Sequence, residues 1–457
     1  MVVVFVLVAL AVLGLLGGVH WYLWRRLVRD TTAPGGWGRR VGTAAAVVLP
    51  LTTVGALVGG RSGVPFAVER ALAWPGYLWL AVLLYLTLAV LVGEAVRPLL
   101  GRWLAARDAG RAADAPSAPA PASAPVAVLA ADGGGVAGDT AASKDARPRG
   151  ETVPGDEAGP MGEAEFEEPV RGDGKAAAPT APTRRLFVAR SVALAASAAA
   201  LGTVGYGAYD VLNGPALKRI RVPLAKLPRS ADGYRIAVVS DIHLGPILGR
   251  AHTQRIVDTI NRAQPDLVAI VGDLVDGSVA DLGPAAEPLS RLRARHGSYF
   301  VTGNHEYFSG AAEWVDHVRE LGVHPLENAR VELPGFDLAG VNDLAGENQE
   351  PAQGPDYERA LGDRDPARAS VLLAHQPVVI HDAVRYGVDL QLSGHTHGGQ
   401  LWPGNYVAEL ANPTVAGLER YGDTQLYVTR GAGAWGPPVR VGAESDITIV
   451  TLASKQA

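Results

Sequence analysis

Short groups of side chains that can bind metals recur through the second half of this sequence, each directly after an apolar run. In open α/β sheets, ligands gather beyond the carboxyl ends of the strands, so loops at these positions can converge on one crevice. We therefore expect these groups to form a single site. They are Asp241-Ile242-His243, Gly272-Asp273 with Asp276-Gly277, Gly303-Asn304-His305-Glu306, His375, and Gly394-His395-Thr396-His397.

The residue types and their spacing favour a pair of divalent cations. In Asp-x-His, both side chains leave an extended loop on the same side and can reach one cation, whereas His-x-His can also divide between two. Carboxylate oxygens combined with neutral imidazoles suit Mn, Fe or Zn and not calcium, and the chain has no cysteine for a thiolate site. Two cations about 3.5–4 Å apart need a bridging carboxylate, for which Asp273 is the candidate.

Each group also has an ordinary explanation when it is taken alone. A Gly-Asp pair followed by Gly is often only a turn, and a single histidine such as His375 is often a core residue. The site hypothesis rests on the occurrence of all the groups together, each after a strand-like run. Other histidines match no such pattern and are expected to be ordinary: His20, His252, His296, His317, His324 and His381.

The elements that must position these groups alternate between strand and helix patterns. In 252–263, for example, Ile256, Val257 and Ile260 recur at helical spacing on one side. Such alternation predicts an α/β layered domain. The expected strands are 234–240, 267–271, 298–301, 371–374, 389–393, 426–430 and 446–452, and the expected helices are 252–263, 311–321 and 377–386.

The ordered motifs D-I-H, G-D-x-V-D, G-N-H-E, H and G-H-T-H resemble those of the calcineurin-like metallophosphoesterase superfamily. GHTHGGQ and the tail GLERYGDTQLYVTRGAGAWGPPVR are similar to its bacterial, membrane-linked branch of predicted phosphohydrolases. The resemblance covers about 233–452. It implies a four-layer sandwich of two mixed β-sheets flanked by helices.

The resemblance also implies a role for each motif residue. The cations would lower the pKa of a water so that hydroxide attacks phosphorus in line at neutral pH. His305 would act as general acid or phosphate clamp, steadied by Asp276. One metal would be held by Asp241, His243 and His397, and the other by Asn304, His375 and His395, with Asp273 bridging. In the tail, Trp435 and Arg440 are candidates for substrate contact, although packing of a β-rich tail would also explain them.

The first half of the chain has the composition of a membrane anchor and a linker. Apolar runs at 2–24, 43–60 and 72–92 are candidate spans, because a span needs about 20 apolar residues; a signal peptide is the alternative for the first. The Ala/Pro/Gly/acidic segment lacks large apolar side chains and is expected to be disordered. The predicted regions are 1–107 with about three transmembrane helices, 108–183 as linker, 184–213 as a fourth membrane helix and 214–457 as the metallophosphoesterase domain.

Positive charges predict how these spans are oriented. Arginines at 25–40 and 97–111 mark cytoplasmic loops under the positive-inside rule, which leaves the catalytic domain outside the cytoplasm. Arg184-Arg185 is either a twin-arginine-like signal or the positive flank of an ordinary span. The basic residues Lys218, Arg219 and Arg221 after the fourth span disagree with this orientation. The expected location is the cell membrane, with several spans.

The sequence favours a phosphodiesterase or phosphomonoesterase that acts on a cell-envelope or lipid-linked substrate. Protein phosphatases of the superfamily usually have Arg after G-D-x-V-D, where this chain has Gly277, so phosphoproteins are not expected as substrates. The net charge of −5 gives no reason to expect a nucleic acid polymer as partner. The alternatives are a pyrophosphatase acting on nucleotide-linked lipids and a non-catalytic, metal-bound sensor module.

Overall fold

The structure is a computed structural model that describes residues 2–60, 62–113 and 183–456. The chain divides into two compact units, residues 1–102 with 184–457 and residues 103–183. The first unit joins the upstream helices to the predicted metal-binding domain. The predicted linker at 108–183 lies outside the described residues except at its ends, where α3 continues to Ala113 and α4 begins at Arg184.

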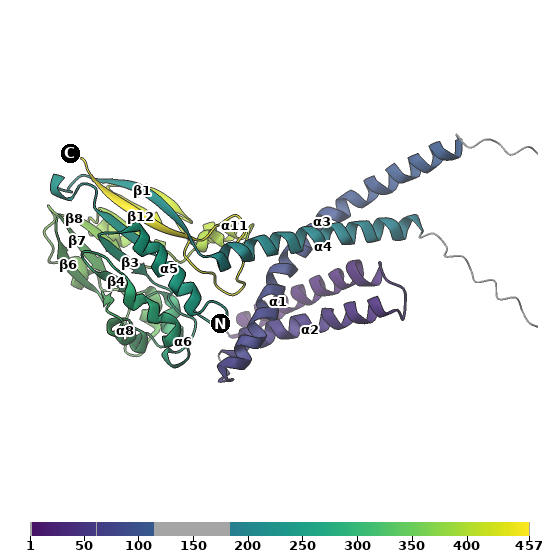
Figure 1. Cartoon of the computed structure of the whole chain (residues 1–457), viewed down its shortest axis with the longest axis horizontal. Coiled ribbons are helices and arrows are strands. Elements are labelled where there is room, and N and C mark those ends of the chain that lie inside the picture. The colour runs from purple at the N-terminus through teal and green to yellow at the C-terminus, as the bar shows by residue number, and fades with distance from the viewer. Residues whose placement is uncertain (1, 61, 114–182, 457) are drawn as a thin grey trace, which may run out of the picture. The chain divides into compact units, whose positions relative to one another are not determined.

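The domain is built around two mixed, six-stranded sheets (Figure 1). The first has the order β1-β12-β2-β3-β4-β5, and only β12 and β2 pair in antiparallel fashion. The second has the order β10-β11-β9-β8-β7-β6, with antiparallel pairs at its two edges. The strands are β1 Ala216–Leu224, β2 Arg235–Val239, β3 Leu267–Val271, β4 Ser298–Val301, β5 His324–Pro325, β6 Ala329–Leu333, β7 Phe336–Gly340, β8 Ala369–Leu373, β9 Leu390–Ser393, β10 Gly417–Tyr421, β11 Thr424–Val428 and β12 Asp446–Ser454.

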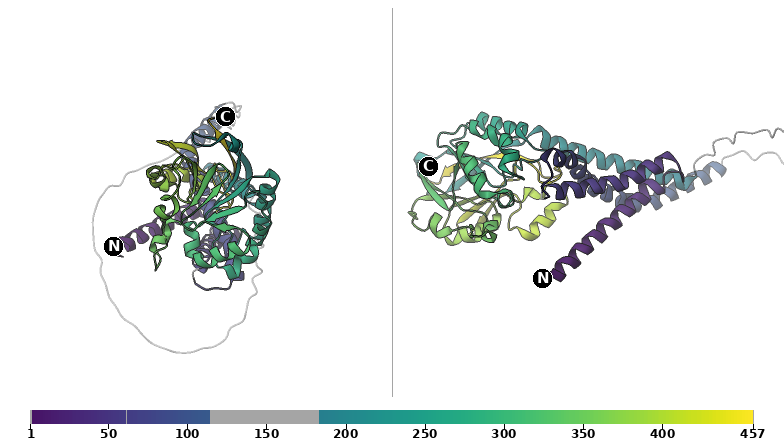
Figure 2. Two further views of the ribbon diagram at one scale, coloured as in Figure 1. Left: turned by 90° about the vertical axis from the view of Figure 1, so that its left-hand side faces the viewer. Right: turned by 90° about the horizontal axis from the view of Figure 1, so that it is seen from below.

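Helices cover the outer faces of both sheets (Figures 1 and 2). Upstream lie α1 Val2–Leu23, continued by a π-helix at Trp24–Arg29, α2 Trp37–Gly59, α3 Phe66–Ala113 and α4 Arg184–Asn213. In the domain lie α5 Arg250–Ala263, α6 Val279–Ala286, α7 Asn304–Ser309, α8 Ala311–Glu320, α9 Tyr357–Leu361, α10 Ile380–Arg385 and α11 Gly404–Ala411. Short 3-10 helices occupy Arg229–Ala231, Glu287–Arg291, Leu344–Asn348, Pro377–Val379 and His397–Gly399.

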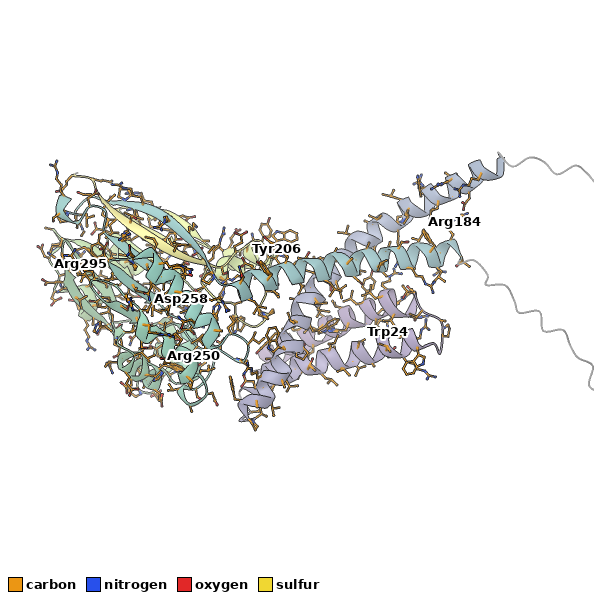
Figure 3. The ribbon with its side chains drawn as sticks, in the orientation of Figure 1. Trp24, Arg184, Tyr206, Arg250, Asp258 and Arg295 are labelled. Atoms are coloured by element: carbon orange, nitrogen blue, oxygen red, sulfur yellow. The ribbon has the colours of Figure 1, made fainter. Side chains whose placement is uncertain are left out.

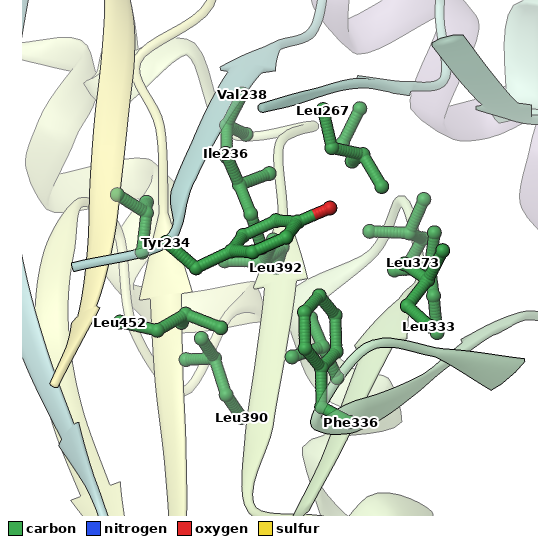
Figure 4. Close-up of a cluster of buried hydrophobic side chains, with 14 of the residues drawn as sticks. Tyr234, Ile236, Val238, Leu267, Leu333, Phe336, Leu373, Leu390, Leu392 and Leu452 are labelled. Atoms are coloured by element: carbon green, nitrogen blue, oxygen red, sulfur yellow. The ribbon is translucent and has the colours of Figure 1, made fainter. Parts of the chain in front are cut away.

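The two-residue period of the strands explains the layers. In β2, Ile236 and Val238 point into the core between the two sheets, whereas Ala237 and Val239 pack under the helices of the first sheet. Figure 4 shows the core between the sheets, where leucines of both sheets surround Tyr234 and Phe336. Because both faces of each sheet are covered, the central strands read as continuous apolar runs.

The predicted fold class, two mixed sheets flanked by helices and preceded by apolar helices, is confirmed. Each predicted strand is present within a few residues of its expected bounds. The sequence did not indicate β1 or the β6–β7 hairpin, because β1 and β6 carry polar, partly exposed residues at the edges of their sheets. It also did not indicate that β12, at the end of the chain, lies inside the first sheet between β1 and β2.

Within the described residues, three helices are long and apolar enough to cross a membrane: α2, α3 and α4. The first predicted span forms α1, near whose start the side chains lie outside the described part. Helix α4 leads into β1 (Figure 1) and packs tightly on the domain. At Gly207, whose carbonyl accepts from Arg440 N at 3.1 Å, a Cβ would lie 2.4 Å from Arg440 O, so only glycine allows this approach.

We predict that Phe336→Ala destabilises the domain by about 3–5 kcal/mol, because it removes a buried ring from the core between the sheets. Phe336 is fully buried and makes an edge contact with Tyr234 at 5.0 Å between ring centroids. The thermal unfolding midpoint of the full chain in detergent checks this. Leu418→Ala, at a half-exposed position on β10, is the control; equal midpoints for the two variants would contradict the prediction.

Candidate metal centre

The predicted ligand loops converge at one end of the sandwich. Strands β2, β3 and β4 are adjacent and parallel in the first sheet, and β8 and β9 are adjacent and parallel in the second. Their carboxyl ends therefore open toward the same space. The loops bring together Asp241 and His243 after β2, Asp273 after β3, Asn304 and His305 after β4, His375 after β8, and His395 and His397 after β9.

Asp241, His243 and His397 form a first buried group, whose ligand atoms all lie within 4.8 Å of one another. His243 Nε2 lies 3.0 Å from His397 Nε2, and His397 Nε2 lies 3.3 Å from Asp241 Oδ1. This group matches one of the predicted ligand sets.

A second group consists of Asp273, His375 and His395. His395 Nδ1 lies 3.0 Å from Asn304 Oδ1, which brings the predicted amide ligand to the same place. Asp273 Oδ2 lies 3.1 Å from His375 Nε2 and 3.7 Å from His243 Nε2. The Asp273 carboxylate therefore stands between the two groups.

The hydrogen bonds around His375 and His243 fit a bound cation. His375 Nδ1 lies 2.9 Å from the carbonyl oxygen of Val271, which can only accept, so Nε2 of the neutral ring carries a lone pair. That buried Nε2 lies 3.1 Å from Asp273 Oδ2. Burial lowers the pKa of His375, but Asp273, Asp241 and Asp343 together raise it well above its usual value. His243 is anchored in the same way, because its Nδ1 lies 3.1 Å from Asp276, and its Nε2 lies 3.0 Å from His397 Nε2. Metal binding at such nitrogens releases the proton that they would otherwise hold.

The electrostatics of the group are dominated by burial and by the neighbouring charges. Burial lowers the pKa of His243, but Asp276, Asp273 and Asp241 together raise it to about 9. Burial and then the nearby imidazoles lower the pKa of His395 to about 4, and the pKa of His397 falls well below its usual value for the same reasons. Two of the imidazoles are therefore held in the neutral form that binds metals.

The backbone of the ligand loops is in a conformation that side chains other than glycine rarely adopt. Left-handed φ angles at non-glycine residues are uncommon, and they cluster at functional sites. The sequence gives no signal for them. They occur here at Asp241 (52°), His243 (49°), Asp273 (52°), His395 (72°) and His397 (52°).

Glu306 holds two of the ligand loops together, a role that the sequence analysis did not assign. Its buried carboxylate accepts hydrogen bonds from Asp273 N at 3.0 Å, Leu274 N at 2.8 Å and Gly303 N at 2.6 Å. Burial and the nearby Asp273 raise its pKa to about 7. The sequence signal was present, because a glutamate at the third helical position can close back on the helix N-terminus.

His305 lies at the mouth of the centre. Its Nδ1 is 2.6 Å from Asp276 Oδ1, as the sequence analysis expected of this pair. Burial raises the pKa of Asp276, but His243 and His305 together lower it to about 2, so the carboxylate is ionised at neutral pH. The exposed rings of Phe308 and Trp435 contact His305, with centroids 5.6 and 5.7 Å away.

The two tail residues expected to touch substrate lie in different environments. Trp435 is 57% exposed beside His305, so substrate contact stays a prediction for it. Arg440 is buried, as in the packing alternative given for it, and its Nη1 donates to the carbonyl of His397 at 3.0 Å. Its Nη2 lies 3.2 Å from His397 Nδ1. This position suits a residue that orients His397, because the guanidinium is enclosed behind the ligand loop.

Known proteins are similar in sequence to the part of the chain that forms this site. A family model described as calcineurin-like phosphoesterase matches residues 234–399. A Danio rerio "Transmembrane protein with metallophosphoesterase domain" is 41% identical over 264 residues, or 55% of this chain and 60% of the relative. An uncharacterized metallophosphoesterase of Helicobacter pylori is 36% identical over 277 residues, or 60% of this chain and 74% of the relative.

Among solved structures, a dimetal phosphatase from Danio rerio aligns with 47% of this chain and 91% of its own, at 13% identity and a TM-score of 0.34. This chain covers about 60% of the length of the Danio rerio transmembrane relative.

We predict that Glu306→Gln weakens Mn²⁺ binding roughly 10- to 100-fold, the usual loss when a group behind the ligands is changed. Glutamine keeps the shape but places an amide group among three backbone donors, which loosens the two loops. Titration calorimetry with the metal-stripped full chain checks this, with Glu320→Gln at an exposed position as control. Unchanged affinity in a variant with normal circular dichroism would show that Glu306 does not position the ligands.

Proposed function

Because this chain belongs to the calcineurin-like metallophosphoesterase family, we propose that it hydrolyses phosphoesters with two divalent cations held at the convergent loops. Family membership implies metal-dependent phosphoester hydrolysis. The observation that carries the two-cation form is the position of Asp273, whose Oδ2 lies near His243 of one group and His375 of the other. A carboxylate shared in this way is what a pair of cations about 3.5–4 Å apart requires.

The residues fit two ligand sets. Asp241, His243 and His397 would hold one cation, and Asn304, His375 and His395 would hold the other, with Asp273 between them. When bound, divalent cations supply a water of lowered pKa and stabilise the charge that develops on phosphoryl oxygens. Their identity is proposed as Mn, Fe or Zn, since the ligands mix carboxylates, an amide and imidazoles.

His305 is proposed to act on the leaving oxygen. The ionised Asp276 carboxylate keeps a proton on Nδ1 and fixes the ring, so that Nε2 can hold or deliver a second proton at the mouth of the centre. A positioned general acid contributes typically about 10²- to 10⁴-fold to the rate. Asp276 also contacts His243 and therefore couples the orientation of the acid to that of a proposed ligand.

We predict that the metal-stripped full chain in detergent regains hydrolysis of p-nitrophenyl phosphate or bis-p-nitrophenyl phosphate when Mn²⁺ is added. Asp273→Asn should bind fewer than two Mn²⁺ per chain and lose this activity, because its amide cannot bridge as a carboxylate does. His305→Ala should slow the hydrolysis of alkyl phosphoesters about 10²-fold or more, because an alkoxide must be protonated as it leaves. Hydrolysis of p-nitrophenyl esters should slow less, since p-nitrophenolate leaves without a proton. A chain with two Mn²⁺ bound that cleaves neither ester would contradict the proposal.

The apolar helices and the transmembrane relative support membrane association. We further propose that the chain crosses the membrane several times, with the catalytic domain outside the cytoplasm. Arg26 bonds Glu94 at 2.8 Å, and Arg190 donates to the carbonyl of Thr31 at 3.0 Å, so the basic ends of several helices lie together. Gly60, between α2 and α3, instead lines a cleft beside His305. The positive-inside rule then assigns the basic end to the cytoplasm.

Because the natural chain has no cysteine, single cysteines can report this topology. We predict that a membrane-impermeant maleimide labels Asp423→Cys, in an exposed turn of the domain, on intact spheroplasts. Ala33→Cys, exposed between α1 and α2, should react only after permeabilisation. The reverse pattern would place the catalytic domain in the cytoplasm.

A further inference from the structure

A cleft of about 160 Å³ opens beside His305 and has two chemically different walls. One wall comes from the ligand loops and is polar, with His243, Asp276 and His305. The other comes from α2 and α3, the helices that are apolar enough to cross a membrane. That second wall consists of Ala56, Leu57, Gly60, Glu69 and Tyr77, and exposed Phe308 and Trp435 also line the cleft.

The helical wall is fixed to the domain by specific contacts. Phe66, the first residue of α3, packs against the buried cluster under the helices of the first sheet. Tyr77 Oη lies 3.3 Å from the carbonyl oxygen of Ala56 and joins the two helices at the cleft. Farther along α3, Tyr85 Oη donates to the carbonyl of Trp402 at 2.9 Å. The first part of α3 therefore lies against the domain at several points.

A ligand that fills this cleft must match both walls. The polar wall suits a phosphoester, whereas Leu57 and Tyr77 offer apolar surface that a small, fully hydrated phosphoester would leave uncovered. Phe308 and Trp435, 68% and 57% exposed, add aromatic surface between the two walls. Burial of an alkyl chain here is favourable in proportion to the apolar area that it covers.

We propose, building on the phosphoesterase function above, that the substrate is a membrane lipid. Its phosphoester would lie beside His305, and its apolar chain would leave the cleft along α2 and α3. The apolar wall belongs to helices that are long and apolar enough to cross a membrane, so the lipid would reach the site without its chain entering water. Glu69, at the start of α3, adds an acceptor for hydroxyl or ammonium donors of the headgroup.

Other exposed apolar side chains lie on α11 and at the domain end of α4. Helix α11 follows the His397 turn closely in the chain, packs against it, and leaves Tyr406, Val407 and Leu410 exposed. Tyr206, labelled in Figure 3, and Tyr209 are exposed on the part of α4 that enters the domain. Aromatic and apolar side chains gathered near the ends of spans are typical of the membrane–water interface.

The first test varies only the apolar part of the substrate. The Mn²⁺-loaded full chain in detergent is given methyl, octyl and hexadecyl phosphates, and their p-nitrophenyl diesters. We expect kcat/KM to rise about 10-fold or more from methyl to hexadecyl, since each buried CH₂ adds to binding. Leu57→Gln should lower this hexadecyl-to-methyl ratio, whereas the matched control Leu51→Gln, on α2 but outside the cleft, should keep it.

The second test measures binding of an alkyl phosphate in the absence of hydrolysis. Metal-stripped chain in lipid nanodiscs is irradiated with a hexadecyl phosphate that carries a diazirine in its chain. Cross-links are expected on α2 and α3 at the cleft, and unlabelled hexadecyl phosphate should displace them while methyl phosphate should not.

The outcomes separate the two proposals. The lipid-substrate proposal would be overturned if kcat/KM did not depend on chain length, or if Leu57→Gln and Leu51→Gln had equal hexadecyl-to-methyl ratios. The phosphoesterase function would then still stand. Displaceable cross-links at the cleft in a chain that cleaves none of the esters would instead overturn the phosphoesterase function and support lipid binding.

Discussion

The candidate site depends on a contact across the two sheets, between Asp273 after β3 and His375 after β8. His375 Nδ1 also donates to the carbonyl of Val271, at the end of β3, so the second sheet is tied to the first at the site itself. Neither sheet alone supplies both proposed ligand sets. The core between the sheets, with Phe336 and the leucines around it, therefore sets the separation of the ligands as well as the stability of the domain.

Such a concentration of carboxylates and imidazoles is unfavourable without a compensating charge. Burial raises the pKa of Asp241 and lowers that of His397, which shows the cost of ionised groups at this buried position. Left-handed backbone at Asp241, His243 and Asp273 adds strain. Glu306 and Arg440 offset it with hydrogen bonds to the ligand loops from behind. These hydrogen bonds hold the candidate ligand loops in one arrangement.

The upstream helices contact the domain at the site itself, which a membrane anchor alone would not require. From the sequence, they were predicted only to hold the domain at a membrane. In the structure, α2 and α3 form one wall of the cleft beside His305, and the carbonyl of Gly207 in α4 bonds Arg440 N, next to the guanidinium that orients His397. The chemical centre and the membrane segment therefore belong to one unit of the fold.

By itself, the sequence determined the strands that precede the site and the residue types of the candidate ligands. The apolar runs 267–271 and 298–301 are strands at those bounds, because buried parallel strands are apolar on both faces. The motifs after them named the ligand candidates, because metal-competent side chains at strand ends are a local pattern. The role of Glu306 could also have been predicted from the sequence, since its position at the start of a helix is a local feature.

The tertiary structure decided what depends on contacts far apart in the chain. These are the position of β12 inside the first sheet, the burial of Arg440 behind His397, and the approach of α3 to the cleft. For Arg440 the sequence left substrate contact and packing open, and the fold buries its guanidinium against the carbonyls of Gly433, His397 and Ala443. In the sequence, Tyr77 is one of several aromatic residues in an apolar run. Only the fold shows that Tyr77 and His305 line the same cleft. The local sequence determines whether a segment forms a helix or a strand. Which other elements the segment packs against depends on how the whole chain buries its apolar surface.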